Sequence, residues 1–135
     1  MDLIQQVHQM LDFKTWAVVG ATDNKDKFGY KIYKMLKKAG YKVYPVNPGL
    51  TAIDGDKCYP TLTALPVKPD AVNVVVPPKV GEAIVKECAT LGIRHVWLQP
   101  GANADQVVET ARQAELDVIH RACILVELRK QDPYL

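Results

Sequence analysis

The sequence has few cysteines, no strong excess of charge of one sign and no long hydrophobic run, and each lack argues against a class of protein. Three cysteines without a CxxC pair argue against a disulfide framework and against a cysteine-rich zinc site. A formal net charge of +2 is too small to indicate a nucleic-acid surface. The apolar runs are shorter than the roughly 20 residues of a membrane span, so we expect no contact with a membrane.

The N-terminal stretch MDLIQQVHQMLDF lacks the basic start and the continuous apolar core of a secretory signal. We therefore expect a cytoplasmic protein whose cysteines are reduced thiols. Its 135 residues are enough to bury a core without disulfides or metals, and we expect a single domain over residues 1–135.

Apolar periodicity indicates that strands and helices alternate along the chain. Compact apolar runs predict strands at 15–19, 42–46, 71–76, 95–98 and 117–120, and helical spacing predicts helices at 2–11, 29–39, 78–91, 103–114 and 124–130. The segment 47–66 is irregular, with a turn at Asp54-Gly55 and a short strand at 56–59. The alternation predicts a Rossmann-like α/β fold, in which a mostly parallel sheet carries helices on both faces.

Two of the predicted helices carry more specific signals. In the helix at 103–114, Asn103 and Gln106 stand in the positions of a capping box. In the helix at 78–91, the stripe predicted to face inward consists of Val80, Ile84, Cys88 and Leu91.

The loop between the first strand and the next helix reads VVGATDNKDKFG and has the features of an anion site. Ligands of open parallel sheets lie beyond the carboxyl ends of the strands, which is where this loop falls. A helix that begins near Gly29 offers free backbone N–H groups and a positive dipole end, which favour a pyrophosphate. Gly20 permits a tight turn, Thr22 offers a hydroxyl, and Lys25 and Lys27 offer positive charge.

The same loop differs from a dinucleotide site. Its glycine spacing is not G-x-G-x-x-G, and the second strand ends at Val46-Asn47-Pro48, without the acidic residue that holds the ribose of NAD. A glycine after a buried strand can also serve only as a turn, and that reading stays open for Gly20 on its own.

Two further strand ends are predicted to lie on the same edge of the sheet. Val76-Pro77-Pro78 forms a rigid apolar lip suited to a flat base, and Gln99-Pro100-Gly101 offers an amide and a close backbone approach. Each motif alone is typical of a turn or a helix start. Their convergence on one edge is what indicates a binding site.

Six motifs that occur in order resemble those of the stand-alone CoA-binding proteins: VVGATDNKDKFGYKI, YKVYPVNP, GDKCYPTL, VVVPPKV, HVWLQPGA and HRACI. The fold of that family is similar to the N-terminal CoA-binding domain of the succinyl-CoA synthetase alpha subunit. The similarity runs from about Thr15 to Val126, which is nearly the whole chain. It implies a pocket for the ADP end of coenzyme A or an acyl-CoA.

The resemblance also implies roles for particular residues. The pyrophosphate would lie on Gly20, Ala21 and Thr22, at the start of the helix with Lys27, Phe28 and Gly29. The adenosine would lie between two walls, with Val46, Asn47 and Pro48 on one side and Val76, Pro77 and Pro78 on the other. The pantetheine arm would lie along Gln99 and Gly101. One departure from the family is Gly49, where members often carry a basic residue, so a contact to the 3′-phosphate is in doubt there. Lys25 or Lys27 can compensate.

Cys123 raises the alternative of an enzyme. It follows His120-Arg121-Ala122 and precedes a predicted helix, an environment that favours a thiolate, so it could meet the thiol of CoA. A free cysteine among apolar neighbours can equally be a small buried hydrophobe. His8, His95 and His120 stand at no spacing typical of a catalytic triad.

In succinyl-CoA synthetase the catalytic phosphohistidine lies in a second domain, and the resemblance covers no such module. The sequence therefore favours a non-catalytic carrier, sensor or regulatory protein whose ligand is CoA or an acyl-CoA, with neither catalytic residues nor a metal site. An unidentified protein partner is compatible with this role. Two alternatives stay open: an NAD(P)-binding module like those of redox sensors, and a CoA-dependent thiol/disulfide enzyme that uses Cys123.

Overall fold

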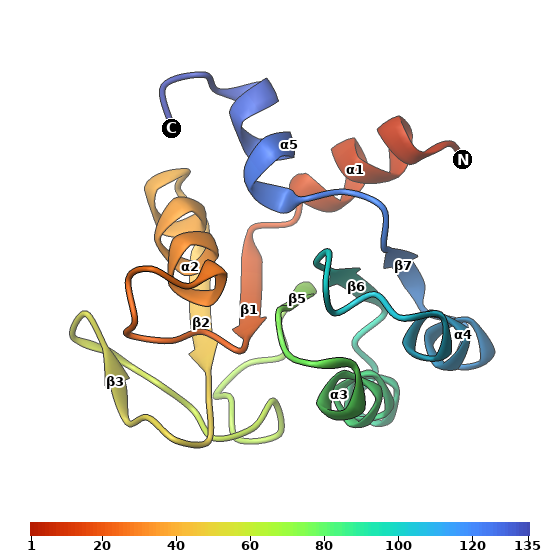
Figure 1. Cartoon of the computed structure of the whole chain (residues 1–135), viewed down its shortest axis with the longest axis horizontal. Helices are drawn as coiled ribbons and strands as arrows, with labels where there is room; N and C mark the ends of the chain where they lie inside the picture. Colours follow the sequence, from red (N-terminus) through yellow and green to blue (C-terminus); the bar gives the residue numbers. More distant parts are fainter.

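The computed structural model describes residues 1–135, and its strands and helices alternate as the sequence predicts (Figure 1). The strands are β1 (Thr15–Val19), β2 (Lys42–Val46), β3 (Ala52–Ile53), β4 (Asp56–Lys57), β5 (Ala71–Val74), β6 (His95–Leu98) and β7 (Asp117–Ile119). The helices are α1 (Leu3–Leu11), α2 (Phe28–Lys38), α3 (Pro78–Leu91), α4 (Asp105–Gln113) and α5 (Ile124–Gln131).

Five strands form one parallel sheet in the order β2-β1-β5-β6-β7, while β3 and β4 form a small antiparallel hairpin. The chain leaves β1 toward β2 and returns to the other side of β1 as β5. The direction of the connections therefore reverses beside β1, which is where open α/β sheets bind their ligands. The predicted Rossmann-like fold is confirmed.

The sheet lies between two layers of helices, with α1, α2 and α5 on one side and α3 and α4 on the other (Figure 1). Successive residues of β1 face opposite layers, because side chains alternate along a strand. Trp16 and Val18 join the core with α2 and α5, and Ala17 and Val19 join the core with α3 and α4. None of the helices combines the length and the apolar character that a membrane crossing requires.

The inward face of α3 differs by one position from the prediction. Gly81, Val85 and Cys88 are the buried residues of this helix, whereas Val80 is 48% exposed. The prediction of an inward Val80 is wrong because it counted only apolar side chains, and Gly81 occupies the position that faces the sheet. Ile84 and Leu91 do pack against the core at its margin, as expected.

The predicted capping box of α4 is also wrong. The helix begins at Asp105, and its cap residue Ala104 offers no side-chain hydrogen bond. The Asn103 side chain instead bridges two loops: its Nδ2 donates to the His120 carbonyl at 2.7 Å, and its Oδ1 accepts from the Gly101 N–H at 3.2 Å. Asparagine competes readily for backbone groups outside helices, which explains the difference.

Two glycines bring the end of β1 against the start of α2. Gly20 has a φ of +98°, and a Cβ added there would lie 2.8 Å from the Val75 carbonyl oxygen at the end of β5. A Cβ added at Gly29 would lie only 2.1 Å from the Gly20 carbonyl oxygen. Backbone therefore meets backbone at both places, and no side chain fits between them.

This contact predicts opposite effects for two glycine substitutions. Gly29→Ala should destabilise the protein by about 2–3 kcal/mol, because the obstructing atom is backbone and cannot rotate away. Gly81→Ala should stabilise it by up to about 1 kcal/mol, since alanine has the higher helix propensity and its Cβ would meet neighbours at 3.8 Å. Urea unfolding of both variants checks this, and shifts of the same sign would contradict it.

Candidate functional site

The loops that follow β1, β2, β5 and β6 form a continuous rim along the carboxyl edge of the sheet, because these four strands are neighbours. Backbone hydrogen bonds connect the strand ends to one another. The Gly20 N–H donates to the Val46 carbonyl at 3.0 Å, and the Gln99 N–H donates to the Val74 carbonyl at 3.0 Å. The predicted site residues therefore lie along one edge, as the sequence argument requires.

The loop from Gly20 to Gly29 folds on itself through short-range hydrogen bonds. Thr22 Oγ1 accepts from the Asn24 N–H at 3.2 Å, and Asn24 Oδ1 accepts from the Asp26 N–H at 3.1 Å. Lys27 is the cap residue of α2 in an extended conformation, and its side chain makes no capping hydrogen bond.

Several amides of this loop are unused within the chain. The backbone N–H groups of Ala21, Thr22, Phe28 and Gly29 make no hydrogen bond to protein atoms. The first turn of α2 holds no acidic residue, and Lys25, Lys27 and Lys31 are exposed around it. Free amides, the positive end of a helix dipole and lysine side chains together are suited to an anion such as a diphosphate.

The Asn47 side chain has internal partners. Its Nδ2 donates to the Ala21 carbonyl at 2.8 Å, and its Oδ1 accepts from the Gly49 N–H at 2.8 Å. Asn47 thus fastens the loop after β2 to the loop after β1. A contact between Asn47 and adenosine stays a prediction, and the neighbouring Pro48 is exposed beside it.

The lip after β5 lies directly over Gly20. A Cβ on Gly20 would come within 2.9 Å of the Val76 side chain, which packs at the margin of the core with α3 and α4. Pro77 is the exposed cap residue of α3, and Pro78 is its first residue. This apolar wall beside the free amides has the position that the sequence predicts for it.

Gln99 is almost fully buried, with 3% of its surface exposed. Its Oε1 accepts from the Ile124 N–H at 2.9 Å and from Asn73 Nδ2 at 3.4 Å, and its Nε2 lies 3.5 Å from Cys123 Sγ. Gln99 therefore holds the start of α5 from inside. Its contact with a pantetheine arm stays a prediction, as does that of Gly101, which is exposed nearby.

Sequence reasoning missed Asn73, the partner of Gln99. It is fully buried at the centre of β5, and its Oδ1 has no hydrogen-bond partner in the protein. The signal was present, because an asparagine interrupts the apolar run AVNVVV. A buried polar side chain is costly unless it is bonded, and the one side-chain hydrogen bond of Asn73 is the long one to Gln99.

No histidine side chain forms a hydrogen bond to a thiol or a hydroxyl group in the structure. His95 Nδ1 lies 2.9 Å from the Asp117 carboxylate, at the opposite end of the strands from the rim. Burial and the nearby Arg121 and Arg112 lower the pKa of His120, so its ring is neutral near pH 7.

Comparison with known proteins identifies the family. A family model described as the CoA binding domain matches residues 14–129, and the chain belongs to this family. It is 39% identical over 83 residues to the ADP-forming acetate–CoA ligase II of Archaeoglobus fulgidus, a match that covers 60% of this chain and 12% of the ligase. The chain therefore corresponds to a small part of that enzyme.

Solved structures of smaller proteins match over nearly their whole length. A conserved hypothetical protein from Pyrococcus furiosus is 39% identical, with a TM-score of 0.82, and the match covers 85% of this chain and 99% of that one. A hypothetical protein from Pyrococcus horikoshii is 28% identical, with a TM-score of 0.87 and coverage of 94% and 89%. Both carry the fold described above.

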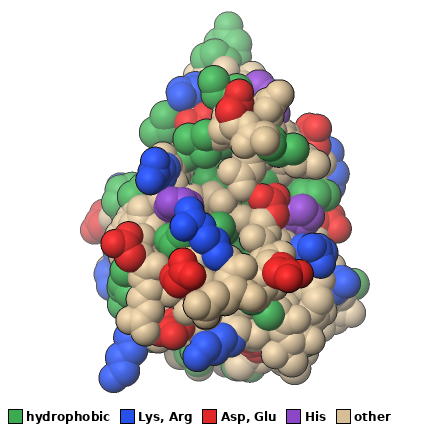
Figure 2. Space-filling view, turned by 90° about the vertical axis from the view of Figure 1, so that its right-hand side faces the viewer, with side chains coloured by type: hydrophobic (Ala, Val, Ile, Leu, Met, Phe, Trp, Pro, Cys, Tyr) green, Lys and Arg blue, Asp and Glu red, His purple; other side chains and the backbone are tan.

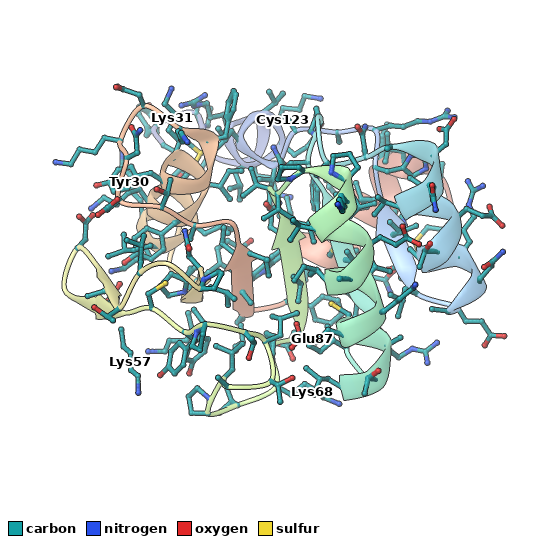
Figure 3. All side chains as sticks on the ribbon, turned by 60° about the horizontal axis from the view of Figure 1, so that its bottom comes forward. Tyr30, Lys31, Lys57, Lys68, Glu87 and Cys123 are labelled. Atoms are coloured by element: carbon teal, nitrogen blue, oxygen red, sulfur yellow. The ribbon has the colours of Figure 1, made fainter.

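The three thiols differ in exposure, which predicts their reactivity. Burial raises the pKa of Cys88 to about 12 and also raises the pKa of Cys58, whereas Cys123 is half-buried at the start of α5 (Figure 3). A thiol reagent at about pH 8 should modify Cys123 rapidly and the other two only on unfolding. Counting reacted thiols in native protein and in Cys123→Ser tests this; a fast phase that persists in the variant would refute it.

Proposed function

We propose that this protein binds coenzyme A or an acyl-CoA through its ADP portion at the rim, and that it acts as a cytoplasmic carrier, sensor or regulatory protein without catalysing a reaction. Membership in the CoA binding domain family supports the ligand. The ligase relative, whose name includes CoA, shares only the portion that matches this chain, so its ligation activity is not carried over.

The observation that carries the proposal is the uncapped start of α2 beside the end of β1. The diphosphate would accept hydrogen bonds from the free amides of Ala21, Thr22, Phe28 and Gly29. Charge-assisted bonds of this kind are stronger than neutral ones. Lys27 would add a positive charge where the helix dipole already favours an anion.

The remaining parts of the ligand follow from the neighbouring loops. The adenine would pack against Val76, Pro77 and Pro78, which expose apolar atoms and offer no competing N–H at either proline. The 3′-phosphate would rely on Lys25 or Lys27, because Gly49 brings no side chain. Weak discrimination for that phosphate is the expected consequence.

The face of the molecule that contains α1 and α4 gives no reason to prefer a polyanion as the ligand. Figure 2 shows acidic and basic side chains interspersed over the face that contains α1 and α4. The overall net charge of +2 agrees with that mixture. A small anionic ligand at a local site fits this charge distribution better than a nucleic acid does.

Calorimetric titration of the protein with CoA, dephospho-CoA and NAD tests the proposal. CoA and dephospho-CoA should bind with affinities within about tenfold of each other, because they differ only in the contacts of the 3′-phosphate. NAD should not compete with either of them. Absence of CoA binding, or a preference for NAD, would overturn the assignment.

A matched pair of lysine variants locates the site. Lys27→Ala should weaken CoA binding about fivefold to tenfold, since it removes a charge-assisted contact to the diphosphate. Lys86→Ala, on the exposed face of α3 away from its start, should leave the affinity unchanged. Equal losses in both variants would show that only the net charge of the protein matters.

A further inference from the structure

A groove of about 860 Å³ runs along α2 and is closed on its other side by α5 and Leu135. It begins at Lys25 and Phe28, next to the rim, and continues away from the carboxyl edge along the outer surface of α2. Most of its lining is therefore separate from the proposed CoA site. In Figure 3, Lys31 and Tyr30 mark its start on α2.

The groove concentrates positive charge. Six of its lining residues are basic, namely Lys25, Lys31, Lys34, Lys37, Lys38 and Arg129, and no acidic residue lines it. These are six of the 17 lysines and arginines in a chain whose net charge is only +2. Lys34 and Lys37 pair with Asp54 and Asp56 of the β3-β4 hairpin, whereas the other four make no ion pair.

The helix dipole does not account for this arrangement. Lys37 and Lys38 lie in the last turn of α2, where positive charge is favourable. Lys25 and Lys31 flank its first turn, where the dipole disfavours them. Neither forms an ion pair, although Lys25 attracts the Asp54 carboxylate from a longer distance. Their position is costly for the free protein and favourable once an anion is bound.

The floor of the groove is apolar. Phe28 is 58% exposed and Leu135 is half-buried, while Met35 and Leu125, only 9% and 6% exposed, close the floor between the basic side chains. Lys31 lies over the Phe28 ring, with its Nζ 5.5 Å from the ring centroid. A ligand that contacts both the basic side chains and the apolar floor must carry carboxylates or other anions on its edges and apolar side chains toward the floor.

We propose that this groove docks an acidic, amphipathic segment of a partner protein, with its apolar residues between Phe28 and Leu135, over Met35 and Leu125, and its carboxylates on Lys31, Lys38 and Arg129. Helix-in-groove recognition has this pattern of apolar anchors and complementary charge. A nucleic acid fits less well, because Phe28 and Tyr30 are the two aromatic residues of the lining and Lys31 lies over the Phe28 ring, so bases find little to stack on.

The test uses the full chain and a labelled synthetic peptide of about four helical turns, with leucines at i and i+3 or i+4 spacing and glutamates elsewhere. Fluorescence anisotropy should show saturable binding that weakens with salt. The double variant Lys31→Glu/Arg129→Glu should bind at least about tenfold more weakly. Lys86→Glu, on the opposite layer of the fold, should bind as the unaltered protein does. Equal melting temperatures establish that the variants are folded.

Further probes distinguish the possible occupants of the groove. Polyglutamate or a sequence-scrambled peptide that bound as tightly as the amphipathic one would overturn the proposal, because the apolar floor would then contribute nothing. Tighter binding of anionic phospholipid vesicles or single-stranded DNA would also overturn it. Sedimentation would overturn the proposal as well if the unaltered protein were a dimer and the double variant a monomer, since the groove would then be an interface between two copies of this chain. The variant Lys38→Glu/Arg129→Glu leaves Lys31 at the start of α2 in place, so it should lose affinity for the peptide and keep its affinity for CoA; unchanged peptide binding in this variant would overturn the proposal, whatever its affinity for CoA.

Discussion

The contact between the Gly20 carbonyl and Gly29 is the constraint on which the rest of the site depends. It places the first turn of α2 against the end of β1 with no side chain between them. The amides at both ends of the loop are thereby held near one another, at the strand where the connections of the sheet reverse. A bulkier residue at Gly29 would separate them, and one at Gly20 would clash with Val75 and Val76 after β5. Either change would cost the loop the geometry of an anion site.

Polar side chains keep the rest of the rim in place around that contact. Asn47 fastens the loop after β2 to Ala21, Asn103 fastens the loop after β6 to the end of β7, and Gln99 holds the start of α5. These bonds are made within the protein itself. The loops are therefore positioned before a ligand arrives, which lowers the entropy that binding must overcome.

The fold could be predicted from the sequence because apolar periodicity and the alternation of elements carry most of the information. Where prediction was wrong, a polar or small residue took a role that its type does not reveal. Gly81 took the inward place expected of Val80, and Asn103 bonded across loops rather than capping α4. The groove between α2 and α5 could not be foreseen, since it requires the packing of segments about 90 residues apart in the chain.

Backbone amide chemical shifts during a titration with CoA test the central claim most directly. Binding of the diphosphate at the start of α2 should move the signals of Ala21, Thr22, Phe28 and Gly29 most strongly, because their N–H groups would gain acceptors. Signals on α3 beyond its first turn should stay in place. Shifts confined to the groove along α2 and α5, or the absence of any saturable shift, would contradict the account.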